Sequence, residues 1–129
     1  MATITVKELN QAIADICEKF FDGVASDSEK AVAEVAAETV TELQSTSPKD
    51  TGKYARGWKV RQNAKQKYNS EVEVYNTKYQ LTHLLEHGHV KVVHGHVLGF
   101  TAARPHIAKA EQHANEKLEN KIIKVVQSQ

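Results

Sequence analysis

Residues 47–76, which read SPKDTGKYARGWKVRQNAKQKYNSEVEVYN, decide the fold of this chain. They begin with the chemistry of a turn. Pro48 fixes its own φ, Asp50 accepts hydrogen bonds from nearby backbone, and Gly52 tolerates a positive φ. Alternating apolar and charged side chains follow the turn. We therefore expect the chain to reverse direction over residues 47–52 and then to enter a sheet.

Two segments within this stretch have the period of a β-strand. Apolar and charged residues alternate over 54–62 and again over 71–76, so each segment is predicted to turn one face, including Trp58, into the core. The segments are successive and joined by a polar loop, which favours an antiparallel hairpin. In such a hairpin Glu71 and Glu73 would lie across from the cations of the first strand and help to fix the register.

A helical stripe precedes this stretch. Apolar residues recur every three or four positions over 6–20 and again over 31–43. Residues 23–28 interrupt the stripe, so the sequence allows either two helices or one bent helix. The helix is expected to end near Ser45, because Pro48 disfavours helical backbone in the residue before it. The first part of the stripe consists of Val6, Leu9, Ile13, Ile16, Cys17 and Phe20.

The remaining segments complete an α+β domain that spans residues 1–129. We expect a short helix over 78–87, one or two short strands or an extended loop over 89–101, and a C-terminal helix with Pro105 in its first turn. The predicted architecture is a long N-terminal helix, bent or broken, with a small antiparallel sheet built on the hairpin. A short middle helix and a C-terminal helix packed on the sheet complete it. The open edges of so small a sheet favour self-assembly.

Composition and length limit the class of protein. The chain has 129 residues, enough for one core, and no apolar run approaches the roughly 18–20 residues that cross a bilayer. Its first residues lack the pattern of a secretory signal, so we expect an intracellular protein with no membrane partner. Cys17 is the one cysteine. Its place in the apolar stripe predicts a small buried side chain.

The net charge of +1 hides an asymmetry along the chain. Residues 1–46 carry three Lys and nine Asp or Glu, a balance of −6, whereas residues 47–109 carry eleven Lys or Arg and four acids, a balance of +7. Residues 110–129 are balanced, with three of each sign. The two charged regions suit head-to-tail contact between subunits, or they are two solvated faces without a partner.

One short motif suggests metal chemistry. Residues 83–87, HLLEH, match the pattern H-x-x-E-H, in which His83 and His87 would share a zinc ion and Glu86 would act as a base. The motif offers no third ligand, and seven histidines make a chance match easy. A zinc-dependent hydrolase is therefore kept only as an alternative. The His-rich segment 83–96 is interpreted as polar surface or subunit contact.

A second motif is a run of cations. The residues are Lys53, Arg56, Lys59, Arg61, Lys65 and Lys67, with no acid between them. Trp58 and Tyr68 lie among them, which is typical of nucleic-acid binding by stacking. However, Trp58 is expected in the core, and Glu71 and Glu73 would neutralise part of the charge. A small DNA-binding module is the second alternative, with loose attraction to phosphates favoured over sequence recognition.

Three blocks of sequence carry a resemblance to a known family. They are SPKDTG at 47–52, VYNTKYQLTHLLEHGH at 74–89 and ARPHIAKAE at 103–111. In this order and spacing, and with the flanking helices, they resemble the phage HK-ninety-seven gene-product-ten-like tail-component family over nearly the whole chain. The positions of the family pattern are occupied by Pro48, Asp50, Thr51, Gly52, Asn76, Tyr79, Glu86, Gly88, Arg104 and Pro105.

The resemblance implies a structural virion protein at the head–tail junction or in the tail, such as a tail completion, neck or minor tail component. It implies no enzymatic activity and no cofactor. The expected partners are further copies of the chain in a ring, commonly a hexamer, and other phage head-completion or tail proteins. Non-specific contact with DNA in the channel, through Lys65 and Lys67, would be tolerated or useful. The protein would be assembled in the bacterial host cytoplasm and would reside in the virion.

Overall fold

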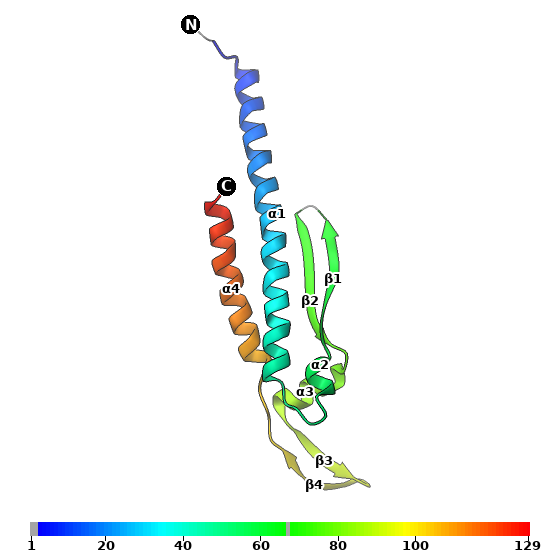
Figure 1. Ribbon diagram of the computed structural model, residues 1–129. Coiled ribbons are helices and arrows are strands. Elements are labelled where there is room, and N and C mark those ends of the chain that lie inside the picture. Colours follow the sequence, from blue (N-terminus) through cyan, green and yellow to red (C-terminus); the bar gives the residue numbers. More distant parts are fainter. Residues whose placement is uncertain (1–2, 67) are drawn as a thin grey trace.

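One long helix, α1, forms the axis of the molecule, and the other elements lie along it or extend from its C-terminal end (Figure 1). The structure is a computed structural model that describes residues 3–66 and 68–129. The elements are α1 (Val6–Thr46), α2 (Lys53–Arg56), β1 (Trp58–Gln66), β2 (Asn69–Asn76), α3 (Tyr79–His87), β3 (His89–Val93), β4 (His96–Thr101) and α4 (Ile107–Gln127). The fold is α+β, as predicted, with two separate two-stranded antiparallel sheets, β1–β2 and β3–β4.

The long helix is continuous. α1 runs without interruption through residues 23–28, so the single-helix alternative is correct and the predicted break is absent. Its start is fixed by a capping box, in which the N–H of Glu8 donates to Thr5 Oγ1 and the N–H of Thr5 donates to Glu8 Oε2, each over 3.1 Å. It ends at Thr46 because Ser47, which precedes a proline, is extended with ψ 144°.

α4 runs antiparallel along one side of α1, and the β1–β2 hairpin lies along the other side (Figure 1). Three polar pairs fix the alignment of the helices: Lys121 with Glu34 at 2.9 Å, Lys117 with Glu38 at 3.5 Å, and His113 with Glu42 at 2.5 Å. They are partly exposed to solvent, so they set the register more than the stability. α4 begins at Ile107, two residues after the proline that was predicted to lie in its first turn.

The register of the β1–β2 hairpin agrees with the sequence prediction in part. Arg61 lies opposite Glu73, and their side chains form an ion pair at 2.6 Å. Glu71, however, lies opposite Ala64, because the register shifts at a bulge between residues 62 and 64. Only one of the two predicted pairs of opposite charge is therefore present.

The core lies where α1 ends. Leu43 of α1, Tyr54 of α2, Trp58 at the start of β1 and Ala110 of α4 form one buried cluster. The strand predicted to begin at residue 54 begins at Trp58 instead, because Lys53–Arg56 form a short helix. That helical turn places both aromatic rings in the core, where their centroids are 5.8 Å apart.

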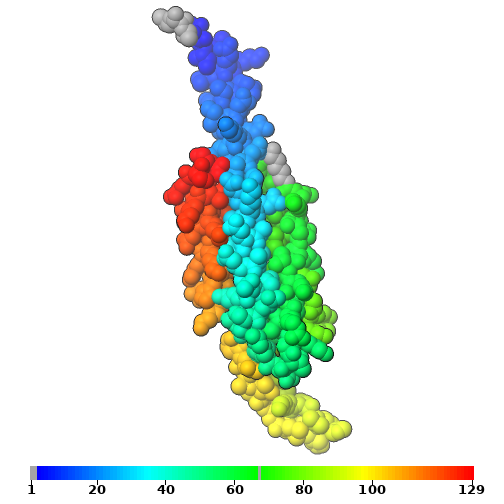
Figure 2. Space-filling view, in the orientation of Figure 1, coloured from blue at the N-terminus to red at the C-terminus, as the bar shows by residue number. Residues whose placement is uncertain are grey.

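Two parts of the molecule extend beyond this body. One is the N-terminal arm, residues 6–21 of α1, and the other is the distal hairpin, β3–β4, at the opposite end (Figure 2). All side chains of residues 3–21 are exposed. The prediction that Cys17 is buried is therefore wrong, because no part of the described chain covers this end of α1. No helix among the described residues has the length and apolar character required to cross a membrane.

Candidate functional site

The turn after α1 is anchored by a buried serine. Ser47 Oγ donates to the carbonyl oxygen of Leu43 and accepts a hydrogen bond of 2.8 Å from Trp58 Nε1. Both side chains are almost fully buried, so each polar atom needs the partner that it has. This pair joins the end of α1 to the start of β1.

Glu86 of α3 caps the N-terminus of α4. Its carboxylate accepts backbone hydrogen bonds from His106 (2.8 Å), Ile107 (2.9 Å) and Ala108 (3.1 Å). These N–H groups have no partner within their own helix, and the helix dipole favours a negative charge at this end. The residue that begins α4 makes no side-chain cap of its own. Glu86 therefore supplies, from another helix, the cap that α4 lacks.

His106 lies buried between this cap and the aromatic core. Its Nδ1 is 2.9 Å from the carbonyl oxygen of Arg104, which can only accept, so Nδ1 carries the proton. Its Nε2 forms a hydrogen bond of 2.7 Å with the Tyr54 hydroxyl. Both ring nitrogens therefore have a hydrogen-bond partner, and the ring packs edge-on against both Tyr54 and Trp58.

The electrostatics of this cluster follow from burial and hydrogen bonding. Burial raises the pKa of Glu86, but the backbone N–H groups of α4 and the nearby His106 outweigh burial, so the pKa lies below its ordinary value of 4.5. Burial, together with the charge of Glu86, raises the pKa of Tyr54 to about 12. At neutral pH the carboxylate is charged and the phenol is neutral, as the hydrogen bonds require.

Asn76 completes the arrangement at the end of β2. Its amide nitrogen donates to the carbonyl oxygen of Tyr54 at 2.9 Å, and its side-chain oxygen accepts from the N–H of Lys78 at 2.8 Å. A Cβ at Gly57 would lie 2.6 Å from that same oxygen, so glycine is required there. We call the whole group the hub, and its residues are Ser47, Tyr54, Trp58, Asn76, Glu86 and His106.

The residues of the family pattern lie in or around the hub to different degrees. Asn76 and Glu86 belong to it, and the backbone of Arg104 supports it. Gly52 has φ +84° and Gly88 has φ +79°, a backbone region that favours glycine. The others lie at the surface: Pro48, Asp50, Thr51 and Pro105 line shallow surface hollows, and Tyr79 is exposed.

Gly88 marks the joint between the body and the distal hairpin. A Cβ at this position would lie 2.7 Å from the carbonyl oxygen of Thr101 and 2.8 Å from the ring of Phe100. On the other side of the joint, the N–H of Arg104 donates to the carbonyl oxygen of Leu85 at 2.7 Å. The two chain segments that lead to the hairpin are therefore held together at its base.

Sequence reasoning missed two members of the hub. Ser47 lies in the block SPKDTG and His106 in the block ARPHIAKAE, and neither block has a pattern that predicts a buried polar residue. Their partners are distant in sequence, since His106 bonds to Tyr54 and Ser47 to Trp58. Residues this far apart in the sequence form no periodic pattern, so the sequence alone does not predict that they meet in the fold.

The H-x-x-E-H segment has a structural explanation. The rings of His83 and His87 lie on one face of α3, with centroids 4.8 Å apart. Glu86 points to α4, where both of its oxygens are engaged. Among residues 3–66 and 68–129, no group of three or more His, Cys, Asp or Glu side chains is placed to hold a metal ion.

The predicted cationic run is divided over two elements. Lys53 and Arg56 lie on α2, whereas Lys59, Arg61 and Lys65 lie on β1, all exposed. Arg61 pairs with an acid of β2 and also lies 4.4 Å over the ring of a tyrosine. Lys65 is 3.6 Å from an acid of α1. The sixth cation, Lys67, lies outside the described residues.

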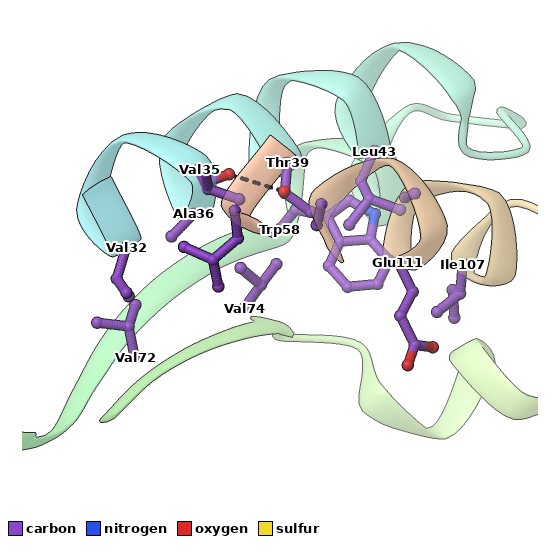
Figure 3. A pocket seen from close by; sticks show the side chains of 13 residues that line it. Val32, Val35, Ala36, Thr39, Leu43, Trp58, Val72, Val74, Ile107 and Glu111 are labelled. Atoms are coloured by element: carbon purple, nitrogen blue, oxygen red, sulfur yellow. Dashed lines mark hydrogen bonds between the residues drawn. The ribbon is translucent and has the colours of Figure 1, made fainter. Parts of the chain in front are cut away.

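An apolar groove of about 310 Å³ lies between α1, β2 and α4 (Figure 3). Val35 of α1, Val74 of β2 and Leu118 of α4 are among the residues that line it. The hydroxyl of Thr39 is already bonded to the carbonyl of Val35 at 2.7 Å, and Glu111 lies at the rim. Ligand-binding pockets usually contain several polar groups that converge on the ligand, and this groove has few. It therefore resembles a part of the apolar core that is open to solvent.

The distal hairpin carries a second apolar face. Alternate residues and cross-strand partners share one face of a hairpin. By this rule Val90, Val92, Val97 and Phe100 lie together, and each is more than half exposed. Together with the N-terminal arm, the hairpin gives the molecule an exposed apolar surface at each end.

Comparison with known proteins gives one finding. A family model described as "Bacteriophage HK97-gp10, putative tail-component" matches residues 7–88, which is more than half of the chain. The match includes all but the first residue of the N-terminal arm, the β1–β2 hairpin and Glu86, and it stops before the distal hairpin and α4. No curated protein and no solved structure matches the chain.

Proposed function

The chain belongs to the bacteriophage HK97-gp10-like family of tail components, and on this premise we propose that it is a structural protein of the virion at the head–tail junction or in the tail. It acts by assembling into a ring and by docking to neighbouring rings, as a tail completion, neck or minor tail component. It has no catalytic role. The observation that carries this proposal is the exposed apolar surface at both ends of an otherwise packed body.

The amount of exposed apolar surface supports assembly. Large contiguous apolar patches are rare on soluble monomers and mark contact with other proteins. In this chain, most large apolar side chains of the N-terminal arm and of the distal hairpin are exposed. In a monomer these apolar surfaces stay in contact with water, whereas in an assembly they are buried against other subunits.

The distribution of charge supports a ring of like subunits. The acidic region, residues 1–46, includes the whole of α1, and the basic region, residues 47–109, includes both hairpins. Acidic surface of one copy and basic surface of the next then attract when copies are placed side by side in the same orientation. Closed rings arise from such heterologous contacts when the rotation between copies closes. Six copies, as the family resemblance implies, is the expected number.

The hub supports a role in orienting the distal hairpin. Glu86 and Arg104 hold the chain on both sides of that hairpin, and Gly88 permits the close approach at its base. A hairpin fixed in this way presents its apolar face in one direction. We propose that this face docks on the neighbouring ring or on another phage head-completion or tail protein.

Contact with DNA is a minor part of the proposal. Lys53, Arg56 and Lys59 are exposed cations near the base of the β1–β2 hairpin. A ring at the junction surrounds the channel through which DNA passes, so loose attraction to phosphates would be compatible with this role. A free protein that bound DNA tightly, with an affinity that fell steeply with salt, would instead favour the DNA-binding alternative.

A deletion experiment tests the function. The gene is removed from the phage or prophage that encodes it, and wild-type protein or a distal-hairpin variant, Val92→Asp with Val97→Asp, is supplied in trans. We expect heads and tails that fail to join or mature without the protein, rescue by the wild type, and no rescue by the variant. The matched control is Val93→Asp, on the opposite face of the same strand. Normal infectious particles without the protein would overturn the proposal.

Native mass spectrometry of the untagged protein tests the mode of action. We expect a closed oligomer without zinc at low and moderate salt, or a monomer that closes into an oligomer with a partner ring. A monomer that carried one zinc ion, lost on His83→Ala, would contradict the proposal and favour the hydrolase alternative. Zinc content and oligomeric state are measured in the same spectra.

A further inference from the structure

The apolar side chains of the N-terminal arm have the spacing of a coiled-coil seam. Val6, Leu9, Ile13, Ile16 and Phe20 follow one another at intervals of three, four, three and four residues. This is the alternation of positions a and d in a heptad, with period 3.5. A seam this narrow fits into the holes on another helix, whereas a sheet surface does not offer such holes. The expected occupant is therefore a helix.

The flanks of the seam favour a partner of the same sequence. The e and g positions of these heptads are Asn10, Ala12, Cys17 and Lys19, of which only the last is charged. In coiled coils these positions decide which chains pair, and like charges there exclude self-pairing. The other charged residues of the arm, such as Asp15, lie outside the a, d, e and g positions and so lie off the seam. Apart from Lys19, no charge on the flanks of the seam opposes contact with a second copy.

The seam is continuous with an interface that the molecule already has. Phe20, Asp27 and Glu34 recur every seven residues and so lie on nearly the same side of α1. Glu34 pairs with Lys121 of α4 at 2.9 Å, and Asp27 accepts a hydrogen bond of 3.0 Å from Gln129, two residues after the end of α4. α4 and the residues after it thus cover this side of α1 up to residue 27. The arm extends the same helix-packing stripe beyond the end of its intramolecular partner.

No helix within the described part of the chain fills this place. Every side chain from residue 3 to residue 21 is exposed, and Ile13 is 51% exposed. α4 ends at Gln127, and the other two helices lie at the far end of α1 (Figure 1). No described segment of this chain supplies the occupant, and a second copy is the one that a self-assembling protein supplies at high local concentration.

We propose that the N-terminal arms of two or more copies of this chain pack against one another along this seam to form a helical bundle. The proposal rests on the self-assembly in the proposed function and names its contact. Isoleucine at both an a and a d position, as with Ile13 and Ile16, favours bundles of more than two helices. The seam is only about two heptads long, so association through it alone is weak and concentration-dependent.

The test uses the full-length protein with matched substitutions on and off the seam. Ile13→Asp places a charge at the centre of the seam, whereas Ala14→Asp places the same charge on the adjacent residue, which is exposed and off the seam. Ile13→Ala with Ile16→Ala removes the apolar surface and keeps strong helix formers. Circular dichroism establishes that each variant retains its helix. Analytical ultracentrifugation then measures self-association.

We expect both seam variants to weaken self-association by about tenfold or more, and Ala14→Asp to leave it unchanged. Cys17 is free and exposed beside the seam, so it supplies a natural site for cross-linking. A short bis-maleimide should join Cys17 of one copy to Cys17 of another in the wild type and in Ala14→Asp, but not in Ile13→Asp. Equal association of all variants, or an oligomer without this cross-link, overturns the proposal.

The arm experiments and the deletion experiment can fail independently of each other. If wild type and Ile13→Asp form the oligomer equally and neither shows the cross-link, the arm inference fails while ring assembly stands. If the wild type shows neither oligomer nor cross-link at any concentration, the arm inference also fails, and the deletion experiment alone decides the function. If the arms cross-link but particles form normally without the gene, the proposed function fails and the arm contact stands.

Discussion

The two halves of α1 carry similar apolar stripes but meet very different surroundings. Leu43, near the C-terminal end, is 3% exposed and packs with Trp58 in the core, whereas Leu9, near the N-terminal end, is 47% exposed. One helix therefore contains a segment that is folded against its own chain and a segment that is folded against nothing in that chain. An apolar stripe tells us that a face is to be covered, but the covering element can belong to another molecule.

The largest expected effect separates these two leucines. Leu43→Ala should lower the free energy of unfolding by about 2–5 kcal/mol, because it removes buried side-chain volume and leaves a cavity. Leu9→Ala, the same substitution in the same helix, should change it by less than about 0.5 kcal/mol in the monomer. Urea unfolding at low protein concentration measures both. Equal losses would mean that the arm is already packed in the monomer.

The next effect concerns the cap that joins α3 to α4. Glu86→Gln should lower the free energy of unfolding by about 1–3 kcal/mol, since the charged acceptor of three backbone N–H groups is lost. The matched control is Glu38→Gln, which removes an exposed ion pair with Lys117 and should cost at most about 1 kcal/mol. Thermal unfolding of the two variants compares them directly, and a larger loss for Glu38→Gln would contradict the role of the cap.

The same carboxylate predicts how stability depends on pH. The pKa of Glu86 is lower in the folded protein than its ordinary value of 4.5, so the folded state binds its proton less readily than the unfolded state. Its contribution to stability is fully present above about pH 5 and is lost as the pH falls through the lowered folded pKa. The difference between wild type and Glu86→Gln should therefore shrink below pH 4.5. A constant difference down to pH 3 would refute this assignment.

A smaller effect is expected at alkaline pH. Burial and the charge of Glu86 raise the pKa of Tyr54 to about 12, above its ordinary value of 10.0. The neutral phenol thus contributes stability that is present below pH 10 and is lost as the pH rises through 12. Ultraviolet titration should show a late tyrosine transition that Tyr54→Phe removes. That substitution should cost about 0.5–1.5 kcal/mol at neutral pH, since the hydrogen bond between Tyr54 and His106 is lost.

Local sequence patterns predicted much of the fold. Pro48 and Gly52 marked the turn after α1, the alternation around Trp58 and Val74 marked the β1–β2 hairpin, and Gly88 marked the end of α3. These signals are local because a turn or a strand depends on neighbouring residues. The interruption at 23–28 was misleading, since Gly23 and the Ser-Asp-Ser run at 26–28 lie within one continuous helix.

The hub and the exposure of the arm could not be predicted in the same way. The Glu86 cap depends on backbone N–H groups some twenty residues away, and the bond from His106 to Tyr54 spans more than fifty. Cys17 lies on a stripe that resembles a buried one in sequence, yet it is exposed, because α4 ends beside Asp27. Where a partner helix stops is a property of the fold, and periodicity does not report it.

Hydrogen–deuterium exchange tests most directly whether α1 consists of a segment folded on its own chain and a segment that awaits a second copy. In the Ile13→Asp variant, amides of residues 27–46 should be strongly protected, and those of the arm, residues 6–21, should exchange quickly, because an exposed helical segment opens at little cost. In the wild-type oligomer the arm should gain protection while residues 27–46 change little. An arm that is equally protected in the variant and the wild type, or that gains nothing on assembly, would contradict this account.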